Sequence, residues 1–86
     1  MTNAPSPINL DKIIHERGRL AIMSALAAQP SMTFNELKDT LGMTDGNLSV
    51  HARHLEQAGY VRIEKRFVGV KPQTSFSLTD AGQKAF

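Results

Sequence analysis

The side chains best suited to recognition chemistry lie between Thr44 and Gly59. Wound as a helix, this stretch gathers its apolar residues on one side, with His51 at the edge: Leu48, Ala52, Leu55 and Ala58. The opposite side is mostly uncharged and rich in short polar groups: Gly46, Asn47, Ser49, Val50, Arg53, His54 and Gln57. A solvated helix face usually carries several Glu and Lys, whereas this composition can lie against base edges. The stretch therefore predicts a DNA-reading helix.

Other kinds of site find little support in the sequence. Cysteine is absent, the serines have no evident base and orienting group beside them, and no glycine-rich phosphate loop occurs. His51 and His54 have a spacing that can share a metal, but the helical wheel puts His51 at the core edge and His54 on the outward face. We therefore predict a protein without enzyme activity, cofactor or metal site. We assign His51 a packed, hydrogen-bonded role in support of the helix.

A second, capped helix is predicted directly before this stretch. Thr33 is a good N-cap, and Glu36 can close a capping box with it. The helix should run to position 40 or 41, where Gly42 supplies the left-handed residue that ends it. Its expected buried residues are Phe34, Leu37 and Leu41. Because Thr44 can cap the next helix, the pattern predicts a helix-turn-helix, with a minimal strand at Met32 before it.

A β-hairpin is predicted after Gly59. Apolar and polar residues alternate from position 60 to 67, the chain turns through Gly69 between 68 and 72, and alternation resumes to Leu78. Basic residues flank the turn: Lys65, Arg66 and Lys71. At a hairpin tip these side chains can reach phosphates or a minor groove, although Lys and Arg also protect strand edges from pairing.

The ends of the chain hold the candidate dimer contacts. Residues 1–7 are expected to form a flexible leader, and residues 8–86 the folded domain. Leu10, Ile13 and Ile14 share one face of a short first helix, which is either a dimer surface or part of the core. A break near positions 15–18 starts a second helix from about Arg17 to Ala28. Its expected apolar stripe is Leu20, Met23, Leu26 and Ala27. Thr79 caps a final helix over 80–86, where Phe86 is the further dimer candidate.

Length and charge narrow the class of protein. The 86 residues suffice for one modest core, and no apolar run approaches the roughly 20 residues that span a membrane. The first residues lack the features of a signal peptide, and the absence of cysteine suits a cytoplasmic protein. The net charge is only +2, but residues 51–71 hold five Lys and Arg against two Asp and Glu. The positive charge therefore lies in and after the proposed reading helix.

The ordered motifs together resemble the winged-helix transcriptional regulators of the MarR and ArsR type. The resemblance rests on positions 19–22, the capped helix at Thr33, the segments 45–49 and 55–61, His51, and the stretch 78–82. It implies an α+β fold, a winged helix-turn-helix, acting as a homodimer on double-stranded DNA at a promoter operator. By that likeness the reading helix enters the major groove and the wing contacts the backbone or minor groove. Many relatives have a basic or polar residue at the position of Val50. A valine can contact only the methyl group of thymine, or it makes no base contact.

The predicted DNA-binding set combines the reading helix with the basic wing. It consists of Thr44, Gly46, Asn47, Ser49, Val50, Arg53, His54, Lys65, Arg66 and Lys71. The alternative function is a docking or dimerisation module of the same fold that binds no specific DNA. The uncharged outward helix face and the basic wing favour DNA, whereas the low net charge permits a protein partner.

Overall fold

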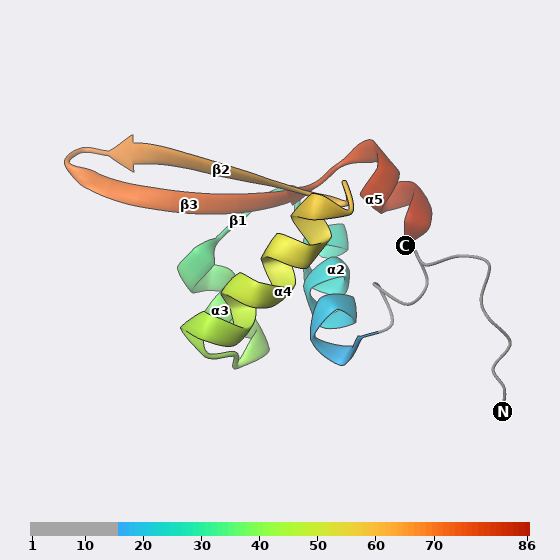
Figure 1. The fold of residues 1–86 in the computed structure, drawn as a ribbon. Helices are drawn as coiled ribbons and strands as arrows, with labels where there is room; N and C mark the ends of the chain where they lie inside the picture. Colours follow the sequence, from blue (N-terminus) through green and yellow to red (C-terminus); the bar gives the residue numbers. More distant parts are fainter. Residues whose placement is uncertain (1–15) are drawn as a thin grey trace, which may run out of the picture.

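The computed structural model describes residues 16–86, which form four helices and a three-stranded sheet (Figure 1). In chain order the elements are α2 (Arg17–Ala28), β1 (Met32–Thr33), α3 (Phe34–Leu41), α4 (Asp45–Gln57), β2 (Val61–Val68), β3 (Lys71–Leu78) and α5 (Asp80–Ala85). This is the predicted α+β arrangement, including the minimal strand at Met32. The predicted leader and the first helix with Leu10, Ile13 and Ile14 lie outside the described residues. Within residues 16–86, no helix is long and apolar enough to cross a membrane.

The two helices of the helix-turn-helix begin and end where their capping residues predict. The Thr33 hydroxyl accepts the Glu36 amide at 3.1 Å, and the Glu36 carboxylate accepts the Thr33 amide at 2.9 Å. Gly42 ends α3 in the left-handed region with a φ of 66°. Thr44 then caps α4 by accepting the Asn47 amide at 3.1 Å. These local hydrogen bonds satisfy amides that the first helical turns leave unpaired, so the helix boundaries follow from local sequence.

The core joins the helices to the base of the sheet. Its fully buried side chains are Ile22, Met23, Leu37, Leu48 and Leu55. The predicted stripe of α2 was partly wrong, because Met23 and Leu26 are buried but Leu20 and Ala27 are exposed. Helix α2 packs against three elements: α3, α4 and β3. As a result, Ile22 is fully buried together with Met23. In α3, Leu37 is fully buried, whereas Phe34 and Leu41 are only partly covered.

Gly18 lies inside α2 and does not break it. A Cβ atom at this position would lie 2.6 Å from Cδ2 and Nε2 of the His51 ring, so the glycine lets the imidazole of α4 pack against α2. The predicted packing of His51 is therefore correct. His51 Nδ1 is buried and has no hydrogen-bond partner among the described residues, so the predicted hydrogen bond is not made by this nitrogen within them.

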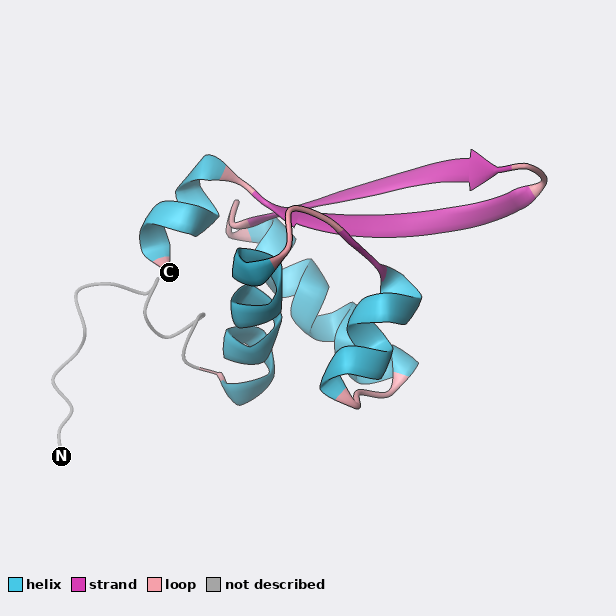
Figure 2. Cartoon of the chain, turned by 180° about the vertical axis from the view of Figure 1, so that it is seen from behind, coloured by secondary structure: helices cyan, strands magenta, loops and turns pink. Residues whose placement is uncertain are grey.

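The sheet has the order β1-β3-β2, and both strand pairs are antiparallel. The hairpin is longer than predicted, because Val68 pairs with Lys71 and only positions 69 and 70 form the turn. A two-residue loop is possible because Gly69 takes a φ of 66°. β1 pairs only with Ser75 and Phe76, so Pro72 lies on an open strand edge that tolerates a residue without an amide hydrogen. The outer half of the hairpin extends beyond the helices (Figures 1 and 2).

The end of α4 is tied to the start of α5. The Tyr60 amide donates to the Leu55 carbonyl at 2.9 Å, and the Thr79 amide donates to the Tyr60 carbonyl at 3.0 Å. The Thr79 hydroxyl accepts the Gly82 amide at 2.9 Å, as predicted for an N-cap, and also donates to the Gly59 carbonyl at 2.6 Å. Gly82 is buried, and a Cβ on it would overlap the Tyr60 carbonyl group. Helix α5 can lie here only because this position lacks a side chain.

We expect Gly82→Ala to destabilise the domain by about 1–3 kcal/mol, because the added methyl group must displace backbone. Gly46→Ala is the matched control, since its Cβ would meet nothing within 4 Å and its helix should gain up to about 1 kcal/mol. Urea unfolding followed by circular dichroism measures both free energies. Equal stability of Gly82→Ala and wild type would contradict this packing of α5.

Candidate nucleic-acid interface

Helix α4 presents the predicted reading residues on one exposed face. Its opposite face is anchored by Leu48, Ala52 and Leu55, whose exposed fractions are 0%, 2% and 0%. Because the helix is a rigid unit with 3.6 residues per turn, burial of these three positions sets the direction of the others. The predicted residues from α4 and its N-cap are all exposed: Thr44, Gly46, Asn47, Ser49, Val50, Arg53 and His54.

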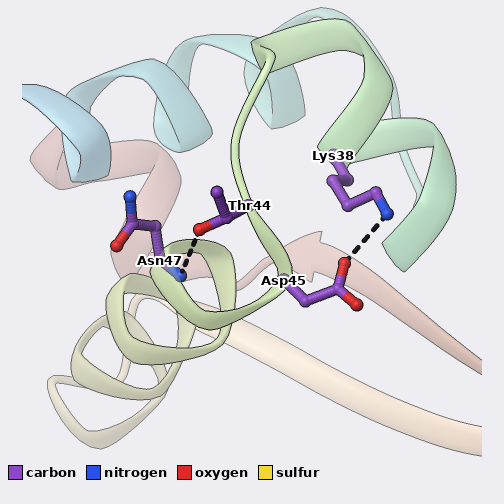
Figure 3. Close-up of polar contacts among 4 residues, drawn as sticks. All are labelled: Lys38, Thr44, Asp45 and Asn47. Atoms are coloured by element: carbon purple, nitrogen blue, oxygen red, sulfur yellow. Dashed lines mark hydrogen bonds and ion pairs between the residues drawn. The ribbon is translucent and has the colours of Figure 1, made fainter.

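The start of α4 is held by an ion pair that the sequence analysis missed. Lys38 Nζ in α3 lies 2.9 Å from the Asp45 carboxylate in the first turn of α4 (Figure 3). The hydrogen bond that the Lys38 ammonium donates to Asp45, and then the charge of Asp45, raise the pKa of the Lys38 amine above its ordinary value of 10.5. The pair joins the two helices across their turn. No helical spacing relates these positions, since only the angle between α3 and α4 brings them together.

A shallow hollow of about 290 Å³ lies on the exposed face of α4. Its lining comes entirely from this helix: Ser49, Val50, Arg53, His54 and Gln57. Val50 is 55% exposed and stands among polar neighbours, so its methyl groups are accessible to a partner. The hollow thus combines a guanidinium, an imidazole, an amide, a hydroxyl and one apolar contact on a single surface.

A larger groove of about 510 Å³ separates α4 from the wing formed by β2 and β3. It is lined by Phe34, Ser49, Ala52, Arg53, Glu56, Ile63, Lys65, Thr74 and Phe76. Arg53 from the helix and Lys65 from the wing therefore line the same groove. Glu56, which the sequence analysis did not consider for the site, brings a negative charge to its wall. The groove connects the exposed helix face to one face of the wing.

The strand register divides the predicted wing cations between two faces. Lys65 is two residues from Ile63 and pairs with Thr74, so it lies on the face that looks into the groove. Arg66 and Lys71 lie on the opposite face, and Lys71 lines a separate hollow of about 550 Å³ near the start of α3. The sequence analysis treated the three cations as one basic tip. The structure gives them different directions, because alternate strand residues point to opposite sides of the sheet.

The other predicted sites are less defined by the structure. Phe86 is 50% exposed at the end of α5 and is the one predicted dimer contact among the described residues. His51 is partly buried against α2, whereas His54 is exposed. Within residues 16–86, no group of three or more His, Cys, Asp or Glu side chains is arranged to hold a metal ion.

Comparison with known proteins identifies the fold and the family. The family model described as "Winged helix DNA-binding domain" matches residues 19–86. An uncharacterized protein of Methanocaldococcus jannaschii is 35% identical over 75 residues, which are 87% of this chain and 82% of that protein.

Solved structures of transcriptional regulators have the same fold. A transcriptional regulator homologue from Pyrococcus horikoshii OT3 is 33% identical, with a TM-score of 0.78 over 86% of this chain and 74% of that one. A MarR-family regulator from Enterococcus faecalis V583 is 25% identical, with a TM-score of 0.79 over 98% of this chain and 81% of that one. The predicted likeness to MarR-type winged-helix regulators is thereby confirmed. The chain belongs to the winged helix DNA-binding domain family, and the solved structures similar to it include transcriptional regulators.

Proposed function

We propose that this protein is a cytoplasmic, sequence-specific transcriptional regulator that binds double-stranded DNA as a homodimer. The observation that carries the proposal is one continuous surface. The exposed face of α4 leads through Arg53 into the groove, and Lys65 of the wing lines the other side of that groove. This arrangement matches what a duplex requires, since base edges are read in the major groove while phosphates are held beside it. No bound cofactor is needed for this mode of binding.

Within the proposed complex, α4 lies in the major groove. Asn47 suits adenine, Arg53 suits the two acceptors of guanine, and Val50 suits the methyl group of thymine. The hydroxyls of Ser49 and Thr44 and the imidazole of His54 supply further contacts to bases or phosphates. Gly46 lacks a side chain, so the backbone of the first turn can approach the duplex closely.

The wing completes the proposed contact by holding phosphates. Lys65 faces the groove beside α4, so it is directed to the phosphate strand next to the major groove. Arg66 and Lys71 point to the other side of the wing and extend the positive surface toward the adjacent minor groove. Such contacts add affinity and salt dependence but carry little sequence information.

A homodimer would place two copies of α4 about 34 Å apart, which is one turn of the duplex. We propose that its interface uses the exposed Phe86 of α5 together with the apolar residues before α2: Leu10, Ile13 and Ile14. Residues 8–86 would then act as one domain behind a short leader.

Selection from a random duplex library tests the proposal as a whole. We expect a pseudo-palindromic site with half-sites about 10 base pairs apart, and a sedimentation mass of two chains on each duplex. Recovery of no consensus would favour the docking alternative. A consensus bound by a single chain would support sequence-specific DNA binding and contradict the homodimer.

Alanine variants of the two surfaces should differ in kind. Arg53→Ala should reduce the binding free energy by about 1–3 kcal/mol and relax the base preference at one position of the site, because a bidentate contact to a base is lost. Loss of a wing cation should weaken the binding of all DNA sequences evenly, as tested by Lys65→Ala, Arg66→Ala and Lys71→Ala. The slope of log affinity against log salt concentration should fall in magnitude by about 0.9 per lost phosphate contact. Titrations of selected and scrambled duplexes at several salt concentrations measure both effects. Unchanged discrimination by Arg53→Ala would show that α4 is placed wrongly.

Glu56→Gln should raise the affinity for the selected duplex by roughly three- to tenfold, since like-charge repulsion near a surface is worth about 1 kcal/mol. Its carboxylate lines the groove where the proposal places phosphate. Asp80→Asn is the matched control, because it changes the net charge equally but lies in the first turn of α5, outside both the groove and the wing. A gain that is equal for both variants would indicate general charge attraction and no phosphate in the groove.

A further inference from the structure

The tip of the wing carries apolar side chains that the rest of the described chain leaves largely exposed. Phe67 is 73% exposed, Val68 is 54% exposed and Val70 is 90% exposed. We call these three residues the apolar tip. The other exposed large hydrophobic side chains of residues 16–86 are Leu20, Val50 and Phe86, which are separate in sequence and belong to different helices or helix ends.

The hairpin gives the apolar tip a narrow, projecting form. Phe67 pairs with Pro72 on one face, Val68 pairs with Lys71 on the other, and Val70 occupies the turn itself. Strand β1 pairs only with Ser75 and Phe76 of β3, so the tip of the hairpin is a two-stranded ribbon (Figure 1). Figure 2 shows the same extension from behind, with the helices gathered at the base of the hairpin. Apolar side chains therefore leave the ribbon on both faces and at its end.

Neither folding nor edge protection accounts for these residues. They lie outside the buried core, so their apolar surface contributes little to the stability of this fold. Protection of a strand edge uses Lys, Arg or Pro, and a Phe and two Val side chains have the opposite effect. Clustered apolar surface of this kind usually marks a site of interaction.

The charges around the apolar tip indicate what it meets. Lys65, Arg66 and Lys71 flank it, and the sequence contains no Asp or Glu between Glu64 and Asp80. The partner should therefore have a negatively charged exterior and an apolar interior. Duplex DNA has this character, because phosphates border each groove and stacked bases lie within it. Lys65 also lines the groove that continues onto α4, so the duplex proposed there passes next to the wing.

We propose that the apolar tip enters the minor groove beside the site of α4 and wedges between base steps, which bends the duplex. The inference rests on the proposed function and adds a deformation of the DNA to it. From Lys65 to Val68 the strand advances about 10 Å, enough to pass from a phosphate strand into a groove about 6 Å wide. Apolar wedges of this kind partly unstack a step and kink DNA by about 20–90°. The cost of unstacking makes flexible pyrimidine-purine steps the preferred sequence under the tip.

The test compares wild type with the variant Phe67→Ser/Val68→Ser/Val70→Ser. These side chains are exposed, so we expect an unchanged unfolding curve. The probe is a duplex of about 30 base pairs that carries the selected sequence, with dyes at its ends and 2-aminopurine at the steps beside the α4 site. Wild type should shorten the distance between the dyes and raise the 2-aminopurine fluorescence. The triple variant should bind at least about tenfold more weakly and, at saturation, show neither change.

The double variant Lys65→Ala/Arg66→Ala serves as the control, because it removes charge and keeps the apolar tip. It should bind more weakly with a lower salt slope, yet bend and unstack the saturated duplex like wild type. A wild-type complex without bending or unstacking would overturn the wedge and leave the proposed function intact. Absence of any wild-type complex would overturn both. Binding of anionic phospholipid vesicles that is lost in the triple variant, with DNA bending unchanged, would assign the apolar tip to a membrane surface.

Discussion

The structure depends above all on the burial of one face of α4. Leu48 and Leu55 are completely enclosed and Ala52 is nearly so, and each enclosed leucine contributes roughly 1.5–3 kcal/mol relative to an exposed one. A rotation of the helix about its axis would expose these side chains and bury the guanidinium of Arg53 without a partner, which is costly. The apolar face therefore fixes the direction of the polar face. The core beneath α4 thus orients the surface proposed to read DNA.

The two ends of α4 are also held by contacts with neighbouring elements. At the start, Thr44 caps the first turn and Lys38 pairs with Asp45 across the turn from α3. At the other end, Gly59 accepts the hydroxyl of Thr79, which also caps α5. A helix held at both ends and along one side can present short side chains with little conformational freedom left to lose. This suits a recognition surface built from Asn and Ser, whose reach is small.

The wing combines a fixed base with an uncovered end. At its base, Val61 and Phe76 belong to the core, and Ile63 packs against it. Beyond Lys65 the helices no longer cover the strands, and the side chains change from core residues to cations and exposed apolar groups. The base therefore sets the angle of the wing against α4, while the tip is available to a partner. In the proposed complex, α4 would contact the bases and Lys65 would contact phosphate. The apolar tip would favour DNA that bends easily.

Features that depend only on neighbouring residues could be predicted from the sequence, because caps and turn glycines act within a few positions. The capping box at Thr33, the end of α3 at Gly42, the cap at Thr44 and the two unlike faces of α4 are of this kind. Contacts between groups from distant positions could not be predicted in this way, because they depend on how the elements pack. The pairing of Lys38 with Asp45, the groove shared by Arg53 and Lys65, and the opposite directions of Lys65 and Arg66 follow from interhelical angles and strand register. The close contacts of Gly18 with His51 and of Gly82 with Tyr60 also depend on tertiary packing, because these residues are far apart in the sequence.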